Sequence, residues 1–171
     1  MTRLYTNNYA FIDANNLHLT MINMGWDLDY KRFRVYLNEK YGVTKAYYFI
    51  GYLKENEGIY TRFREYGYTV VFKEVLKIKN EETGEITIKG NVDAELVLQA
   101  MIDFGNYRQA VIVSSDGDYA CLIKYLILKK KLLTVFAPCE AGCSHLLVKA
   151  SQGNVAYVGN LRRILEYTPI K

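Results

Sequence analysis

The sequence predicts an α/β fold in which helices cover both faces of a central, mostly parallel sheet. Short apolar runs that suit buried strands alternate along the chain with longer segments whose apolar residues recur at helical spacing. Half of the 171 residues are hydrophobic and only two are proline, which excludes a disordered or proline-rich chain. Because no linker or repeat divides the sequence, we expect a single domain over residues 1–171.

The expected elements of the first part of the chain alternate between strand and helix. They are the strand 9–12, the helix 29–41, the strand 46–50, the helix 58–66 and the strand 68–72. In the first helix, Phe33, Leu37 and Tyr41 share one face, and Gly42 ends the helix. Gly67 ends the second helix in the same way.

An interruption follows, after which the alternation resumes. Two runs of alternating apolar and polar residues flank the polar segment 80–84, which predicts an inserted β-hairpin around residues 75–89. The elements expected next are the helix 91–104, the strand 110–113, the helix 117–130, the strand 132–136, the helix 144–150 and the strand 155–158. Strands that alternate with helices favour a parallel sheet, and such sheets bind ligands beyond the carboxyl ends of their strands.

Two of the expected strands are followed by aspartate. Asp13 comes directly after the strand 9–12, and Asp116 lies three residues beyond the strand 110–113. If both strands are central, the two side chains project from the same edge of the sheet and converge. Structural alternatives stay open, because Asp116 can cap the next helix with Asp118 in its first turn, and Asp13 can occupy a turn.

Asp93 is a third acidic candidate, near the start of the expected helix 91–104. Its side chain should face the sheet, unlike that of Glu95, because it is in line with the apolar residues Leu96, Val97, Ala100 and Phe104. Helix capping is the alternative for Asp93. Clustered carboxylates raise each other's pKa unless a cation compensates them. All-oxygen ligands suit Mg²⁺ or Mn²⁺ rather than Zn²⁺, and such an ion activates water beside a phosphodiester.

Four segments, taken in order, resemble NYN domains, which are PIN-like nuclease domains, and in particular their bacterial LabA-like branch. They are Phe-Ile-Asp-Ala-Asn-Asn at 11–16, Lys-Gly-Asn-Val-Asp at 89–93, Val-Ser-Ser-Asp-Gly-Asp-Tyr at 113–119 and Ser-His-Leu-Leu at 144–147. The resemblance covers nearly the whole chain. It implies a Rossmann-like PIN fold and cleavage of RNA that depends on Mg²⁺ or Mn²⁺.

Carried over by position, the resemblance implies one acidic site for metal binding and catalysis, formed by Asp13, Asp93, Asp116 and Asp118. The residues expected to contact or position the substrate are Asn16, Lys89, Ser114, Ser115 and Lys124. Among them, Asn16 would support Asp13, and Lys89 would lie beside the phosphate. Ser151 stands where many relatives carry aspartate, so a further acid is absent there.

The expected function is endonucleolytic, metal-dependent hydrolysis of single-stranded or locally unpaired RNA by a cytoplasmic enzyme. Two alternatives stay open: a non-catalytic RNA-binding or regulatory module, and a PIN-like nuclease directed at DNA. The net charge of +4 is mildly basic, and the surface outside the four aspartates is more positive still, which suits a polyanion. A homodimer is compatible with the sequence.

Composition adds three further expectations. No apolar run reaches the about 18 residues that a membrane-spanning helix needs, and we expect neither a signal peptide nor a membrane partner. Three cysteines argue against a disulfide framework. Of the 16 tyrosines, Tyr47, Tyr48 and Tyr68 are expected in the core. Aromatic side chains also stack on unpaired bases, and the candidates for this role are Tyr5, Tyr9, Tyr52, Tyr60 and Tyr119.

Overall fold

The computed structural model describes residues 7–81 and 83–169, without the side chains at positions 77, 88 and 89. Its strands are β1 (Asn8–Asp13), β2 (Val43–Gly51), β3 (Tyr68–Lys73), β4 (Leu76–Lys79), β5 (Ile86–Lys89), β6 (Ala110–Val113), β7 (Leu132–Ala137) and β8 (Val155–Tyr157). Its α-helices are α1 (Ala14–Asn23), α2 (Tyr30–Tyr41), α3 (Glu57–Glu65), α4 (Asp93–Ile102), α5 (Ala120–Leu128), α6 (His145–Ala150) and α7 (Arg162–Leu165). Short 3₁₀ turns are η1 (Lys54–Asn56), η2 (Gly117–Tyr119) and η3 (Val158–Leu161).

Six of the described strands form one parallel sheet in the order β3-β2-β1-β6-β7-β8. This confirms the predicted α/β class with a mostly parallel sheet. The chain builds outward from β1 through β2 to β3, then crosses over and builds outward from β6 to β8 on the other side. The winding direction therefore changes between β1 and β6, and at such a switch point the crevice beyond the carboxyl ends of the strands binds ligands.

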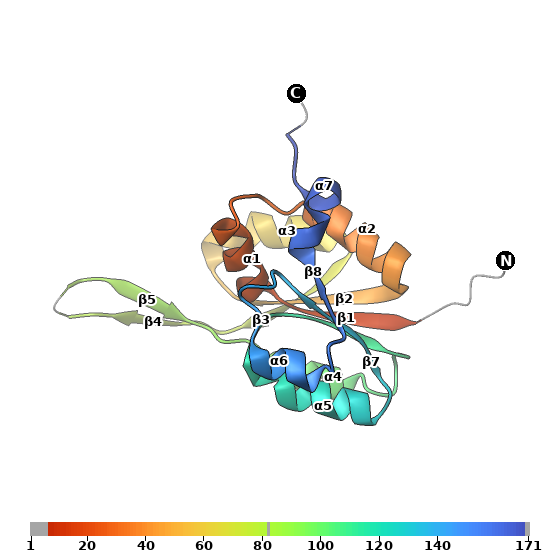
Figure 1. Ribbon diagram of the computed structural model, residues 1–171. Helices are drawn as coiled ribbons and strands as arrows, with labels where there is room; N and C mark the ends of the chain where they lie inside the picture. The colour runs from red at the N-terminus through yellow and green to blue at the C-terminus, as the bar shows by residue number, and fades with distance from the viewer. Residues whose placement is uncertain (1–6, 82, 170–171) are drawn as a thin grey trace.

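Helices cover both faces of this sheet, as predicted (Figure 1). The helices α1, α2, α3 and α7 lie on one face, and α4, α5 and α6 lie on the other. Adjacent residues of β1 point into different cores: Ile12 belongs to the same core as Leu17 and Phe33, whereas Phe11 belongs to that of Leu96. Because both faces are covered, a central strand is apolar at consecutive positions, which explains the short apolar runs in the sequence.

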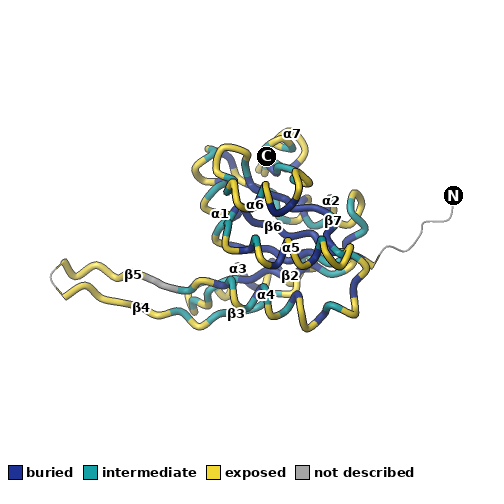
Figure 2. Tube along the Cα trace, turned by 60° about the horizontal axis from the view of Figure 1, so that its bottom comes forward, coloured by how far each residue is buried: buried dark blue, intermediate teal, exposed yellow. Residues whose placement is uncertain are grey.

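The strands β4 and β5 form a separate antiparallel hairpin, which confirms the insertion predicted around residues 75–89. The hairpin projects away from the sheet and its helices (Figures 1 and 2). Its apolar side chains are largely exposed, with Leu76 at 69% and Ile86 at 62% of full exposure. Neither of the two hydrophobic cores includes a described side chain of this hairpin.

The helix α1 is absent from the sequence prediction. It begins directly after β1, where the carboxylate of Asp13 accepts a hydrogen bond from the backbone N–H of Asn16. Ala14, Leu17 and Met21 are buried along one face, but the helix also contains three asparagines, which have low helix propensity. Tertiary packing therefore stabilises a segment whose local sequence does not indicate a helix.

Other differences concern element boundaries and exposure. The helix expected over 117–130 consists of the turn η2 followed by α5, which ends at Leu128. The expected burial of Tyr47, Tyr48 and Tyr68 is confirmed. Tyr60 and Tyr119 are wholly buried and present no ring face at the surface on which a base could stack, so that expectation is wrong for them. Tyr5 lies outside the described residues, and Tyr9 and Tyr52 are partly exposed.

Candidate functional site

Three carboxylates meet at the carboxyl edge of the sheet, beside the switch point. Asp93, Asp116 and Asp118 each place an oxygen within 4.8 Å of the other two. Asp93 is the first residue of α4, Asp116 precedes η2, and Asp118 lies within η2. Asp93 and Asp116 are half-buried and Asp118 is exposed, so solvent and ions have access to the group. Of the four predicted aspartates, this group contains all but Asp13.

The loop after β6 fixes the position of Asp116. The hydroxyl of Ser114, which is fully buried, accepts a hydrogen bond from the backbone N–H of Asp116 at 3.1 Å. The carboxylate of Asp116 in turn accepts one from the N–H of Asp118 at 3.0 Å, so Asp116 caps η2, as the structural alternative suggested. Capping engages one of its oxygens and is compatible with its place in the acidic group.

The side chain of Asn91 holds Asp93. Its amide nitrogen donates to the carboxylate of Asp93 at 2.7 Å, and its amide oxygen accepts from the backbone N–H of Asp93 at 2.8 Å. Val92 occupies the capping position without a side-chain hydrogen bond, so the capping alternative is wrong for Asp93. Leu96 is buried in the core, as the predicted apolar face of α4 requires.

Asp13 lies next to this acidic group and is much more buried, at 6% exposure. Its carboxylate accepts hydrogen bonds from the N–H of Asn16 at 3.1 Å and from the hydroxyl of Tyr119 at 3.2 Å. Burial raises the pKa of Asp13, and the charges of Asp93 and Asp116 raise it further against the effect of these two donors. Asp13 is therefore electrostatically coupled to the group, although its oxygens lie outside it.

Asn16 and Ser115 connect the two sides of the switch point. The side-chain oxygen of Asn16 accepts hydrogen bonds from the backbone N–H of Ser115 at 2.9 Å and from its hydroxyl at 3.0 Å. The carbonyl of Ser115 accepts from the N–H of Ser144, at the start of α6. These bonds tie α1 and α6 to the loop that carries Asp116. The side chain of Asn16 thus positions this loop. The backbone N–H of Asn16 positions the carboxylate of Asp13.

The structure says little about the two lysines, Lys89 and Lys124, that the sequence predicts as substrate contacts. The side chain of Lys89 lies outside the described part of the molecule, although its backbone ends β5, four residues before Asp93. Lys124 is exposed on α5, whose residues Ile123 and Leu126 are buried. Both stay predictions as substrate contacts.

Tyr119 belongs to the site as a buried partner of Asp13, whereas the sequence suggested it as a ring that stacks on bases. Its side chain is fully buried, and its hydroxyl donates to Asp13. Burial and the neighbouring carboxylates Asp13 and Asp93 raise the pKa of Tyr119 well above its usual value, so the hydroxyl keeps its proton. A signal for this position exists in the sequence, because Tyr119 precedes Leu122, Ile123 and Leu126 at helical spacing.

Comparison with known proteins identifies the fold family. A model of the NYN domain matches residues 9–157. The chain belongs to the NYN domain family. This NYN domain is 28% identical over 130 residues to the low amplitude and bright protein LabA of Synechococcus elongatus, an alignment that covers 73% of this chain and 70% of LabA. These matches confirm the predicted family and its LabA-like branch.

A solved structure shares the fold of this NYN domain. It is the crystal structure of a protein of unknown function from Vibrio parahaemolyticus, with a TM-score of 0.74 and 18% sequence identity. The superposition covers 92% of this chain and 96% of that one. At this identity the likeness concerns the fold alone. Among its described residues, this NYN domain contains no helix long and apolar enough to cross a membrane.

Proposed function

We propose that this NYN domain is a ribonuclease that hydrolyses RNA phosphodiester bonds endonucleolytically, with Mg²⁺ or Mn²⁺ as cofactor. The observation that carries the proposal is the meeting of Asp93, Asp116 and Asp118 within 4.8 Å, beside the buried Asp13, at the switch point of the sheet. Membership of a PIN-like nuclease family supports the reaction class. The free cysteines fit a reducing compartment, in keeping with a cytoplasmic enzyme.

The donor set fits a hard divalent cation. Oxygen ligands lie about 2.1 Å from Mg²⁺, so ligands on opposite sides of the ion are about 4.2 Å apart. Carboxylate oxygens within 4.8 Å of one another reach such an arrangement through small side-chain adjustments. No described basic side chain pairs with these three acids, so they need positive charge from an ion. They offer oxygen alone, which favours Mg²⁺ or Mn²⁺ over Zn²⁺.

The residues of the site would have different roles in hydrolysis. Asp93, Asp116 and Asp118 would hold the metal, which would supply an activated water and stabilise the leaving oxygen. Asp13, held by Tyr119, would orient that water or complete the ligand shell. Ser114, Ser115 and Asn16 would keep the Asp116 loop in place. Lys89 would contact the phosphate that is attacked, and Lys124 would contact the bound RNA.

Cleavage of an end-labelled, single-stranded RNA tests this proposal. We expect internal cuts in the presence of Mg²⁺ or Mn²⁺ and none in EDTA. The cleavage rate of Asp116→Asn should be at least about 100-fold lower, because removal of a metal ligand lowers activity more than removal of a group that orients a ligand. Asp27→Asn is the matched control, because Asp27 is an exposed aspartate on the loop before α2. An intact RNA with both metals would contradict the nuclease, and a preference for DNA of the same sequence would contradict the RNA substrate.

Metal binding has a readout that is independent of turnover. Mn²⁺ at 100 times its dissociation constant should stabilise the fold by about 2.7 kcal/mol, which raises the melting temperature. We expect this rise in wild type and in Asp27→Asn, and its loss in Asp116→Asn. An equal rise in all three proteins would contradict metal binding by these carboxylates.

A further inference from the structure

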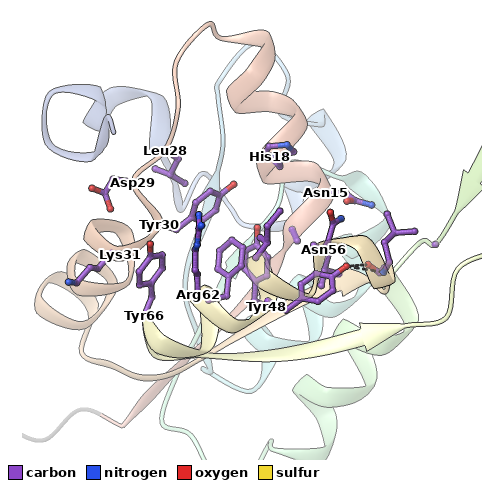
Figure 3. A pocket seen from close by; sticks show the side chains of 18 of the residues that line it. Asn15, His18, Leu28, Asp29, Tyr30, Lys31, Tyr48, Asn56, Arg62 and Tyr66 are labelled. Atoms are coloured by element: carbon purple, nitrogen blue, oxygen red, sulfur yellow. Dashed lines mark hydrogen bonds between the residues drawn. The ribbon is translucent and has the colours of Figure 1, made fainter. Parts of the chain in front are cut away.

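A large cavity lies on the α1 side of the sheet, between α1, the start of α2 and α3 (Figure 3). Its volume of about 640 Å³ is within the range of small-molecule sites, about 300–1,000 Å³. The floor is formed by Tyr48 and Ile50 of β2, and the far wall by Tyr60 and Phe63 of α3. The hydroxyl of Tyr60 is engaged within the wall, accepting from the N–H of Leu53 at 2.9 Å. The cavity is therefore built on fixed core residues.

One end of the cavity adjoins the acidic site. Ala14 and Asn15 line it, and they follow Asp13 directly in the chain. On the other side of this end lies Gly90, three residues before Asp93. The same two segments thus line the cavity and carry Asp13 and Asp93, which brings the cavity next to the acidic site. An RNA chain bound at the acidic site can therefore also reach the cavity.

The lining combines aromatic rings with positive charge. Tyr30 and Tyr66 are half-buried and Tyr167 is exposed, and Figure 3 shows Tyr30, Tyr66 and Arg62 pointing into the cavity. Arg62 and Lys31 form no hydrogen bond or ion pair through their side chains with any described residue. The carboxylate of Asp29, which also lines the cavity, is in contrast paired with Arg32.

The engagement of Asp29 leaves the cavity with unpaired positive charge. Its carboxylate accepts from the N–H of Arg32 at 2.9 Å and pairs with the guanidinium of the same residue at 3.3 Å. Aromatic faces beside free cations are the combination that binds single-stranded nucleic acid, through stacking on bases and contacts to phosphate. A paired base cannot enter such a cavity without leaving its helix.

We propose that this cavity binds an unpaired nucleotide of the RNA substrate, whose base stacks on Tyr66 or Tyr30 while Arg62 and Lys31 contact the neighbouring phosphates. The inference rests on the proposed ribonuclease function and adds to it a site that selects unpaired RNA next to the bond that is cut. It gives the enzyme a preference for single strands and bulges over regular duplex, with the cut at a fixed distance from the bound nucleotide.

Binding of fluorescein-labelled RNA to the Asp116→Asn protein in EDTA tests this site without cleavage. Single-stranded RNA should bind at least about tenfold more tightly than the same sequence in a duplex. Arg62→Ala should weaken binding and lower the slope of log K against log salt by about 0.7, the value for one phosphate contact on a single strand. The matched control is Arg64→Ala, on the same helix but outside the cavity, which should leave the slope unchanged.

A scan with single abasic nucleotides identifies the bound base. One position should lose about tenfold in affinity, as expected when one stacked base is removed. This loss should disappear in Tyr66→Leu or in Tyr30→Leu, and its persistence in both variants would contradict stacking in this cavity. Melting temperatures verify that the variants are folded. A flat scan, together with equal salt slopes for Arg62→Ala and Arg64→Ala, would overturn the site even if wild type cleaves RNA. A positive scan without cleavage by wild type would overturn the nuclease and leave the binding site standing.

Discussion

The contact between Asp13 and Tyr119 shows how the protein keeps a buried carboxylate next to other acids. Burial and the nearby charges of Asp93 and Asp116 disfavour the ionised form of Asp13. The hydroxyl of Tyr119 and the N–H of Asn16 oppose this effect. From the sequence, Asp13 is identifiable because it directly follows an apolar strand, whereas its partner Tyr119 lies 106 positions away and becomes its neighbour only in the fold.

At the scale of single residues, we predict that Tyr119→Phe destabilises the protein by about 1–3 kcal/mol, because it leaves an oxygen of Asp13 without its buried donor. In the Asp13→Asn background the same change should cost less, since the neutral amide needs the hydroxyl less than the carboxylate does. Urea unfolding of the four proteins of this double-mutant cycle gives the coupling.

Tyr107→Phe is the matched control for this cycle. Its hydroxyl is also buried but donates to the neutral carbonyl of Ala100 at 3.0 Å. Its removal should therefore cost the same in wild type and in Asp13→Asn. Equal costs of Tyr119→Phe in the two backgrounds would contradict a specific interaction between Tyr119 and Asp13.

At the scale of elements, the site depends on close packing between η2 and the start of α6. A Cβ atom on Gly117 would lie 2.5 Å from the hydroxyl oxygen of Ser144 and 3.3 Å from its Cβ. Gly117 is therefore needed for the approach of two elements, which the sequence does not reveal because the partner helix is distant in the chain. The strands and most helices are predictable from local periodicity, but α1 is not, because its stability comes from burial against the sheet.

We accordingly predict that Gly117→Ala destabilises the protein by about 1–3 kcal/mol, as overpacking does, and displaces Asp118 from the acidic group. Thermal unfolding should show the first effect, and a weaker Mn²⁺-dependent rise in melting temperature the second. Gly105→Ala serves as the control, since a Cβ on Gly105 meets nothing within 4 Å. If the two variants behave alike, the packing argument for Gly117 is wrong.

At the scale of the whole molecule, tyrosines occur in both cores and in the lining of the cavity. Tyr48 and Tyr68 belong to the core on the α1 side, and Tyr47, Tyr107 and Tyr119 to the core on the other side. Their hydroxyls reach the edges of the cores, where they meet polar partners. The sequence indicates that strand tyrosines are buried, but it cannot indicate which of their hydroxyls meets which acid, because these pairs join separate elements.

One such pair, Tyr47 with Asp103, should influence stability toward acid. Asp103 is buried at 7% exposure and accepts hydrogen bonds from Tyr47, Gln99 and Asn106. Burial alone would raise the pKa of Asp103, but these donors and the charge of Lys45 outweigh burial, and the pKa lies below its usual value of 3.8. An aspartate with a lowered pKa adds stability above its unfolded-state pKa and loses it as the pH falls through the folded-state pKa.

We therefore predict that Asp103→Asn lowers the free energy of unfolding by about 1–3 kcal/mol at pH 7, because an amide cannot accept from all three donors and sets one N–H group against another. As the pH falls below 3.8, the difference from wild type should shrink, because the unfolded chain takes up a proton at Asp103 while the folded protein does not. The loss is complete once the pH has passed the lowered pKa of the folded protein, where Asp103 is protonated in both states. Urea unfolding between pH 3 and pH 7 measures both effects, with the exposed Asp27→Asn as control. If the difference in free energy of unfolding between wild type and Asp103→Asn stays constant over this range, the charge of Asp103 does not contribute to the stability.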